Sequence, residues 1–219
     1  MFQSSRHPKN TEYHFTFLRH AESVGNALGY YQGQSDFPLS ETGKQQAHAL
    51  AARWQREGKT FQLALSSPLQ RAHQTAQIVC AALNLPLTLE DQWMERNNGI
   101  LAGLNAEQAA QTAPPPDMLH PYHPIGKTGE SQWEVYLRAG TALQSLLHRQ
   151  PGNYLIVSHG GFLNTLVYAI LGIGIQANFQ GPRFRFRNSA FATFTYRPHN
   201  HEWIVEAIND HSHWSFNDD

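Results

Sequence analysis

Apolar residues follow two different spacings along this chain. Short runs such as Tyr13–Leu18 are mostly apolar and aromatic and include a threonine, which is typical of strands. Between them lie longer segments in which apolar residues recur every three or four positions, as a helix with one buried face requires. The predicted strands cover 13–18, 61–67, 85–90, 153–158, 183–196 and 202–208, and the predicted helices cover 38–58, 68–85 and a segment that starts at 160.

Local signals support the helix boundaries. Ser40 precedes the first helical repeat, where its side chain can cap the helix, and Gly58 follows the repeat. Pro68 stands near the start of the second helix, where a missing backbone N–H costs little. Strands that alternate with helices imply a mostly parallel sheet covered by helices on both faces. The expected fold class is therefore α/β.

No segment has the composition of a linker between domains, so residues 1–219 are expected to form a single domain. The segment 97–129 departs from the strand and helix pattern and contains several prolines. A long irregular segment inside a compact domain is usually functional or disordered. We expect it to form a loop excursion that covers the active site.

Charge and composition limit the partners. The formal net charge is −1, so no overall basic field exists that would attract nucleic acid or an anionic membrane. The N-terminus lacks the apolar core of a signal peptide, and no run approaches the ~18 apolar residues of a membrane span. The one cysteine, Cys80, cannot form an intrachain disulfide, which fits a reducing compartment. We expect a cytoplasmic protein; the sequence leaves its oligomeric state open.

Charged and titratable side chains follow several predicted strands. Arg19 and His20 come directly after the first strand, Arg71 after the second, Glu95 after the third and His159 after the strand at 153–158. In open parallel sheets, ligands bind beyond the carboxyl ends of the strands. One pocket is therefore expected to collect two arginines, two histidines and a carboxylate.

These residue types suit phosphoryl transfer from a phosphate monoester. Arginine forks bind phosphate oxygens and keep their charge, and a neutral imidazole can attack phosphorus. A carboxylic acid such as that of Glu95 can protonate the leaving oxygen. The arginines and the second histidine can neutralise the phosphoryl oxygens, so the reaction is expected to need neither a metal nor a cofactor.

The motifs "LRHAES..N", "SSPLQRAHQTA", "ERNNGILAG", "GES" and "SHGG" occur in an order that resembles the histidine phosphatase superfamily, which includes the cofactor-dependent phosphoglycerate mutases. The resemblance runs from about residue 15 to about residue 195. It implies a three-layer α/β/α sandwich with His20 as the nucleophile that becomes phosphohistidine. By the same resemblance, Arg19, Asn26, Arg71 and His159 bind the phosphate, and Glu95 is the proton donor.

Two positions separate this chain from the mutase branch. Mutases carry a Tyr and a Lys that hold the phosphoglycerate, and these places are occupied by Asn98 and Ala106 here. We therefore expect a metal-independent phosphatase acting on a small phosphorylated metabolite or a phosphoprotein. A phosphoglycerate mutase and a non-catalytic phosphate-binding module are the alternatives. Ala21 also replaces the Gly usual after the nucleophile, which costs little if its φ is negative.

Other polar residues are weaker candidates. Gln32, Gly33 and Gly160 are candidates for further contact with the substrate, although the first two also suit a plain turn. Three arginines alternate with phenylalanine in the last part of the chain and are expected to form a solvated face of an edge strand. The histidine pairs "PHNH" and "HSH" lack the spacing of a zinc site. The three arginines are Arg183, Arg185 and Arg187.

Overall fold

The computed structural model describes residues 11–215, which include a six-stranded sheet. The strands run in the order β3-β2-β4-β1-β5-β6 across it. The pairs β3–β2, β2–β4 and β4–β1 are parallel, whereas β5 and β6 are antiparallel to their neighbours. The strands are β1 (Tyr13–Arg19), β2 (Leu63–Ser66), β3 (Leu87–Leu89), β4 (Asn153–Ser158), β5 (Phe191–Arg197) and β6 (Glu202–Asp210).

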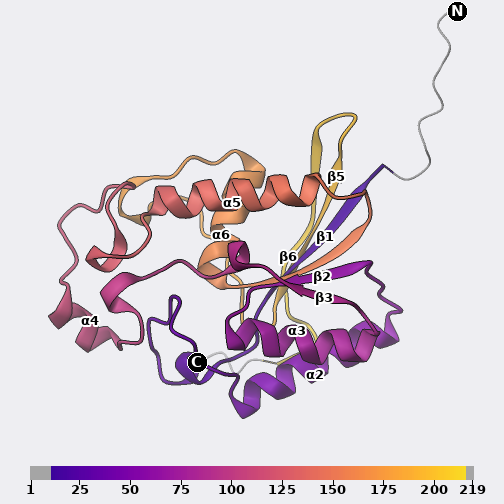
Figure 1. Cartoon of the computed structure of the whole chain (residues 1–219), viewed down its shortest axis with the longest axis horizontal. Helices are drawn as coiled ribbons and strands as arrows, with labels where there is room; N and C mark the ends of the chain where they lie inside the picture. Colours follow the sequence, from indigo (N-terminus) through magenta and orange to yellow (C-terminus); the bar gives the residue numbers. More distant parts are fainter. Residues whose placement is uncertain (1–10, 216–219) are drawn as a thin grey trace, which may run out of the picture.

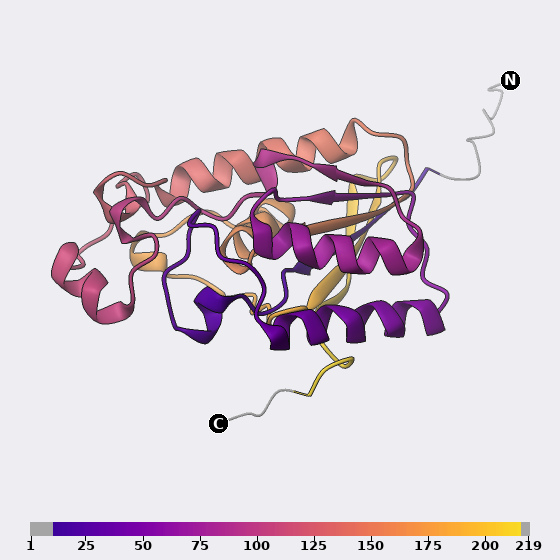
Figure 2. The same ribbon diagram turned by 60° about the horizontal axis from the view of Figure 1, so that its bottom comes forward.

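Helices cover both faces of the sheet (Figure 1). One pair packs below the sheet and the other pair above it in this view, and turning the molecule separates the three layers (Figure 2). The lower pair is α2 (Glu41–Arg56) with α3 (Gln70–Leu83), and the upper pair is α5 (Gln132–Leu147) with α6 (Gly160–Leu171). The prediction of a three-layer, mostly parallel α/β/α fold is confirmed.

Each face of the sheet has its own apolar core. Phe15 and Phe17 of β1 belong to the cluster under α5 and α6, and Leu18 belongs to the cluster under α2 and α3. Strand β4 divides in the same way, with Ile156 facing one layer and Val157 the other. A strand buried on both faces must be apolar at nearly every position, which explains the continuous apolar runs in the sequence.

The ends of the long helices follow their sequence signals. The Ser40 hydroxyl accepts a hydrogen bond from the backbone N–H of Gly43 and caps α2. Ser131 and Glu134 form a capping box at the start of α5. Ala21, which follows His20, is fully buried and does not have a positive φ, so the backbone there tolerates its Cβ.

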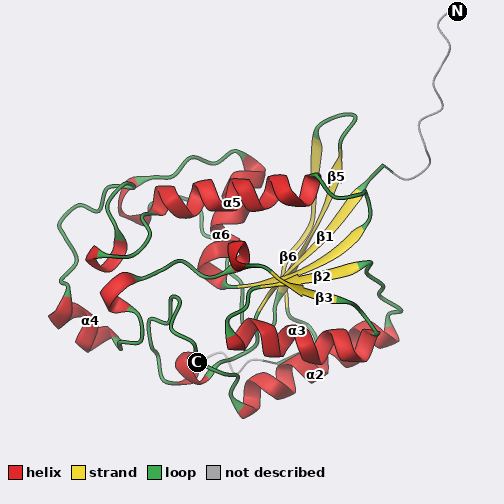
Figure 3. Cartoon of the chain, in the orientation of Figure 1, coloured by secondary structure: helices red, strands yellow, loops and turns green. Residues whose placement is uncertain are grey.

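Two segments differ from a regular strand and helix pattern (Figure 3). The predicted strand at 183–196 is wrong in its first half: β5 begins only at Phe191, because residues 182–190 hydrogen-bond to α6 and to β1 instead of pairing with a strand. The excursion at 97–129 lies at the left-hand end of the molecule in Figure 1. It contains α4 (Ala106–Thr112) and two short 3₁₀ turns, Gly99–Leu101 and Ile125–Lys127.

None of the helices within residues 11–215 is both long and apolar enough to cross a membrane. Two further short elements are α1 (Val24–Ala27), which follows β1, and a 3₁₀ turn at Ala177–Phe179, which follows α6. Another 3₁₀ turn, Asp91–Trp93, leads from β3 toward Glu95.

Candidate active site

Two histidines meet where β1 and β4 end side by side. Arg19 at the end of β1 pairs in register with Ser158 at the end of β4, so the residues that follow them, His20 and His159, become neighbours. The backbone N–H of His20 donates to the carbonyl of Ser158 at 2.9 Å. The centroids of the two imidazole rings are 5.1 Å apart. Parallel pairing thus joins two sites that are far apart in the sequence.

The hydrogen bond of His20 determines which ring nitrogen is free. Its Nδ1 lies 2.7 Å from the carbonyl oxygen of Ala21. A carbonyl oxygen only accepts, so Nδ1 carries the proton and Nε2 keeps its lone pair. Burial of the ring, followed by the positive charges of Arg71 and Arg19, lowers the pKa of His20 well below its ordinary value. His20 is therefore a neutral imidazole at neutral pH.

His159 is fully buried and is also neutral. Burial first, and then the charge of Arg71, lowers the pKa of His159 well below its ordinary value. Its Nε2 lies 2.8 Å from the hydroxyl oxygen of Ser67, which already accepts from the backbone N–H of Leu69. The Ser67 hydrogen is then available to His159 Nε2. We assign the imidazole proton to Nδ1 on this basis.

The two arginines are anchored by backbone carbonyls. Arg71, in the first turn of α3, donates from Nη1 to the Ser35 carbonyl at 2.9 Å and from Nη2 to the Gly33 carbonyl at 2.6 Å. Burial lowers the pKa of Arg71 to about 10, so it stays charged at neutral pH. Arg19 donates from Nη1 to the Phe186 carbonyl at 2.6 Å, and burial also lowers its pKa.

Three buried nitrogens at this site have no hydrogen-bond partner within the described part of the chain. They are Nε of Arg19, Nε of Arg71 and Nδ1 of His159. A buried donor without an acceptor costs about 1–3 kcal/mol. An anion bound among them would supply the missing acceptors and would offset the repulsion between the two guanidinium groups. The arrangement is therefore suited to binding an oxyanion.

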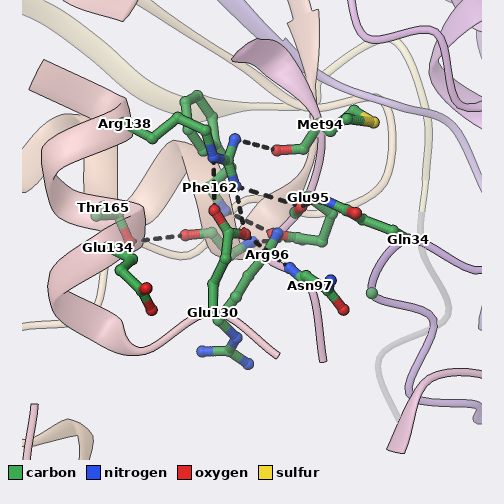
Figure 4. Close-up of polar contacts among 12 residues, drawn as sticks. Gln34, Met94, Glu95, Arg96, Asn97, Glu130, Glu134, Arg138, Phe162 and Thr165 are labelled. Carbon is green, nitrogen blue, oxygen red and sulfur yellow. Dashed lines mark hydrogen bonds and ion pairs between the residues drawn. The ribbon is translucent and has the colours of Figure 1, made fainter. Parts of the chain in front are cut away.

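Glu95 reaches this group from the segment after β3 and caps α6. Its Oε1 accepts from the backbone N–H groups of Phe162 at 2.8 Å and Arg96 at 2.9 Å, and its Oε2 accepts from Gly161 at 2.9 Å (Figure 4). Free N–H groups and the helix dipole attract a carboxylate to a helix N-terminus. A Cβ on Gly161 would lie 2.8 Å from Glu95 Oε1, so only glycine allows this approach.

An ion pair holds the segment that carries Glu95. Arg138 of α5 donates from Nε and Nη2 to the two carboxylate oxygens of Glu130, each at 2.8 Å (Figure 4). Its Nη1 donates to the Met94 carbonyl at 2.8 Å, and its guanidinium lies 4.6 Å from the centre of the Phe162 ring. Sequence reasoning did not assign these two residues a role. The "GES" motif, which includes Glu130, was the one available signal.

A cleft of about 1040 Å³ opens beside Arg19 and Glu95. Its lining includes the start of α6 and residues from Ile175–Phe186. His20 and His159, which are 3% and 0% exposed, are not among the lining residues. The cleft therefore reaches the site at Arg19 and Glu95, and the two imidazole rings lie behind these residues, outside its lining.

The arginines near the C-terminus are not on an edge strand, which corrects the sequence interpretation. Arg183 and Arg185 precede β5 and line the cleft, together with Arg96. Both are exposed, as expected, but they face a concave surface that also contains Glu95. The alternation with phenylalanine was visible in the sequence; the contacts that replace strand pairing were not.

The model of the histidine phosphatase superfamily (branch 1) matches residues 15–211 of this chain. The chain belongs to this superfamily. The match spans the sheet except its first two residues, and it includes every residue of the site described above. The resemblance inferred from the motifs is confirmed at the level of the family.

Proteins similar to this chain include both mutases and phosphatases by name. A probable phosphoglycerate mutase GpmB of Yersinia pestis (strain Pestoides F) is 32% identical over 207 residues, covering 90% of this chain and 92% of the relative. The mycobacterial glucosyl-3-phosphoglycerate phosphatase in complex with VO3 is 26% identical, with a TM-score of 0.75 over 90% of this chain and 98% of that one. A putative alpha-ribazole-5'-P phosphatase from Escherichia coli shares the fold, with 23% identity and a TM-score of 0.77 over 91% and 97% of the two chains.

Asn26 and Gln32 both have hydrogen-bond partners within the fold. Asn26 Oδ1 accepts from the side chain of Asn188 at 3.0 Å and from the backbone N–H of Ser23 at 3.2 Å, and the second bond completes the capping box of α1, whose N-cap is Ser23. The Ser23 hydroxyl oxygen lies 2.7 Å from Gln32 Oε1, and Gln32 is buried. Contacts of Asn26 and Gln32 with a substrate remain predictions.

The glycines have separate surroundings. Gly33 has a φ of +50° and presents its carbonyl to Arg71, which makes it a support for that arginine. A Cβ on Gly160 would lie 3.3 Å from Arg19 Nε, so Gly160 borders one of the unpartnered nitrogens. Their role toward the substrate also remains a prediction.

The excursion lines a second pocket, of about 600 Å³, beside the cleft. Asn98 and Ala106, which stand where mutases carry substrate-binding residues, both line it. The two cavities share Tyr31, Arg96 and Phe179 as lining residues. That the excursion covers the active site remains a prediction.

Within residues 11–215, no group of three or more His, Cys, Asp or Glu side chains is arranged to hold a metal ion. In the "HSH" segment, His213 contacts a hydroxyl group: its Nε2 lies 2.9 Å from the Ser189 hydroxyl oxygen. Cys80 is buried, and burial raises its pKa to about 12, so it is a packed apolar residue.

Proposed function

We propose that this histidine phosphatase hydrolyses a small phosphate monoester through a phosphohistidine on His20. The observation that carries the proposal is the neutral His20 ring with a free Nε2, next to three unpartnered buried nitrogens. A nucleophile at phosphorus needs a lone pair, and the phosphoryl oxygens need fixed donors. We further propose that the enzyme acts on a metabolite in the cytoplasm.

In the first step, the Nε2 lone pair attacks phosphorus and the bond between phosphorus and the ester oxygen breaks. Arg19, Arg71 and His159 donate hydrogen bonds to the three remaining phosphoryl oxygens. Glu95, protonated on Oε2, gives its proton to the departing oxygen, which leaves as an alcohol. Oε2 suits this role because it accepts one backbone N–H whereas Oε1 accepts two.

In the second step, the Glu95 carboxylate takes a proton from water as the water oxygen attacks phosphorus. The bond between phosphorus and Nε2 breaks, inorganic phosphate leaves and the imidazole lone pair is restored. The carboxylate with its backbone donors is already the form that this step needs. One residue thus serves as acid and then as base, and no proton is gained or lost over the cycle beyond the hydrolysis itself.

A phosphoglycerate mutase is the second candidate, since the Yersinia relative bears that name. Asn98 and Ala106 speak against it, because neither can replace the Tyr and Lys expected of mutases in charge or size. The two candidates differ in the fate of the phosphoryl group. Incubation with 3-phosphoglycerate, with and without 2,3-bisphosphoglycerate, would yield 2-phosphoglycerate from a mutase and free phosphate from a phosphatase.

The proposed function is tested with purified protein and EDTA. A panel of phosphorylated metabolites, phosphopeptides and p-nitrophenyl phosphate is screened for phosphate release, and the reaction is quenched rapidly for intact-mass analysis. We expect turnover and a transient phosphoenzyme in the wild type, and neither in His20→Ala. His199→Ala, which removes a histidine from an exposed turn, is the matched control. A His20→Ala protein that turns over normally would refute the assignment.

A further inference from the structure

Residues 182–186 are not a strand, yet hydrogen bonds fix them as a wall of the cleft, which Arg183–Phe186 line. Tyr168 donates its hydroxyl to the Pro182 carbonyl, and the Phe184 backbone N–H donates to Asn164 Oδ1 at 2.8 Å. The Phe186 carbonyl accepts from Arg19 at 2.6 Å. Three consecutive even-numbered residues are therefore fixed to α6 and to the end of β1.

The odd-numbered residues between these anchors are both arginines. Arg183 and Arg185 are exposed and line the cleft, whereas Phe184 is half-buried and Phe186 is 4% exposed. The Phe184 ring also packs edge-on against Tyr168, with 6.0 Å between centroids. The anchors thus hold two guanidinium groups at the cleft with little freedom in the backbone that carries them.

The cleft contains more positive charge than the transfer of one phosphoryl group needs. Four arginines line it, with one carboxylate, that of Glu95. Within residues 11–215, neither Arg183, Arg185 nor Arg96 forms an ion pair with an Asp or Glu side chain. Arg185 also lies close enough to Arg19 to help lower its pKa. Like charges gathered in one concave surface repel each other unless an anion joins them.

The cleft is also larger than a phosphoryl group requires. Its volume of about 1040 Å³ is at the upper end of ordinary small-molecule sites, which span about 300–1,000 Å³. Aromatic rings, among them Tyr168 and Phe184, line it beside the arginines. This combination fits an organic body that carries charge at some distance from the scissile phosphate.

We propose that Arg183 and Arg185 bind a second anionic group, a carboxylate or a phosphate, on a substrate whose first phosphate occupies the site around His20. This inference rests on the proposed function, and it names the substrate class: a monoester with an organic body between two anionic ends. Arg183 and Arg185 are then specificity-determining residues. Arginine forks suit carboxylate and phosphate oxygens alike.

The test compares probes that differ at one remote group. They are 4-carboxybenzyl phosphate, its neutral isostere 4-carbamoylbenzyl phosphate, and 4-phosphonobenzyl phosphate, whose phosphonate cannot be hydrolysed. A second series with a biphenyl spacer covers a longer separation. We expect the wild type to prefer an acid-bearing probe in at least one series by about 10–100-fold in kcat/KM, the size of a charge-assisted contact.

The variants Arg183→Gln, Arg185→Gln and the double variant should lose most of that preference, because activity toward the acidic probe falls by a larger factor than activity toward the neutral one. Arg56→Gln, on the exposed end of α2, removes the same charge elsewhere and should keep the preference. The second anionic group of the substrate is identified by the probe, carboxylate or phosphonate, whose kcat/KM falls more in these variants.

Binding to His20→Ala protein, measured by calorimetry with the same probes, separates the two proposals. Suppose that the wild type shows no turnover, while the His20→Ala protein still binds the acidic probes more tightly through Arg183 and Arg185. That outcome would refute the phosphatase proposal and keep the second anion site. An active phosphatase with equal affinity for acidic and neutral probes, or with a preference unchanged in the double variant, would refute the second anion site.

Discussion

At the scale of single residues, Arg71 shows how much of a guanidinium is already committed before a ligand arrives. Nη1 and Nη2 are used on the carbonyls of Ser35 and Gly33, and Nε alone lacks a partner. The planar fork allows one side chain to hold two carbonyls on one side and an anion on the other. An ammonium group cannot reproduce that geometry.

Arg71→Lys should therefore reduce kcat/KM for p-nitrophenyl phosphate about 10–100-fold although the charge is kept, which corresponds to the ~1.5–3 kcal/mol of a hydrogen bond to a charged group. Steady-state kinetics and competition by inorganic phosphate measure the effect. Arg56→Lys, at an exposed position on α2, is the control. Wild-type kinetics in Arg71→Lys would mean that the phosphate lies elsewhere.

Glu95→Gln tests the acid. The amide keeps the shape of the side chain but has no proton to give, so formation of the phosphoenzyme should slow strongly with an alkyl phosphate and much less with p-nitrophenyl phosphate, whose leaving group is stable as an anion. The alkyl effect should reach roughly 10²–10⁴-fold. Since Glu95 would also activate water, the pre-steady-state burst is the proper readout. Equal slowing with both substrates would point to another acid, with Glu90, Asp91 and Glu107 the next residues to test.

At the scale of elements, α5 and α6 position Glu95 together. The first backbone N–H groups of α6 hold its carboxylate, and Arg138 of α5 holds the preceding carbonyl of Met94 and, through Glu130, the backbone N–H of Asn97. Arg138 does not line the cleft and contacts the segment that carries Glu95, so it is a positioning residue. The carboxylate is held from two elements at once.

Arg138→Met should loosen the segment that carries Glu95 and so weaken proton donation by Glu95. We expect kcat for an alkyl phosphate to fall more than kcat for an aryl phosphate, while KM changes little. Arg138→Lys should recover only part of the loss, because lysine cannot bind Glu130 through two nitrogens. Arg53→Met, which breaks the ion pair with Asp210 of β6, away from this segment, is the matched control and should leave the ratio of alkyl to aryl rates unchanged. The same ratio in Arg138→Met would exclude a positioning role.

Elements differed in how far the sequence predicted them. Strands buried on both faces, such as Tyr13–Arg19, were visible as apolar runs, and the residues at their ends followed from the rule for parallel sheets. The wall at 182–186 was not predicted from the sequence, because alternating Arg and Phe suit an edge strand equally well. What distinguishes the two is a set of long-range contacts, from Arg19, Asn164 and Tyr168, that no local pattern contains.

The supports of the site were hidden for the same reason. Arg138 reads as one charged residue on an amphipathic helix, and only the packing of α5 against the segment after β3 brings it to Met94 and Glu130. His20 and His159 were identified because motifs mark them. Their tautomers depend on hydrogen bonds with Ala21 and Ser67, and no sequence motif predicts those bonds.

At the scale of the whole molecule, the site places two neutral histidines inside the fold, and this links stability to pH. The pKa of each is well below its ordinary value of 6.5 in the folded state, chiefly through burial. Below that pH the unfolded chain binds protons that the folded chain does not. Folding stability therefore falls as the pH decreases below 6.5, and it stops falling only below the folded pKa.

Urea unfolding between pH 7.5 and 5.5 measures this loss, which amounts to at most ~1.4 kcal/mol per pH unit for each buried histidine. His20→Gln and His159→Gln should each show a shallower decrease than the wild type. His199→Gln, at an exposed turn, is the control, because it removes one imidazole from the chain without changing the buried pair. Parallel pH profiles in all four proteins would contradict a neutral, buried pair.

The hydrogen bond from His20 Nδ1 to the Ala21 carbonyl has a consequence for the chemistry of the intermediate. Histidine can be phosphorylated on either nitrogen, and the two products are distinct compounds with different stabilities and nuclear magnetic resonance spectra. A backbone carbonyl occupies one nitrogen before the substrate arrives, so the fold selects the regioisomer. Any phosphoenzyme formed on His20 would be the τ isomer, carried on Nε2, and an antibody specific for the π isomer should not recognise it.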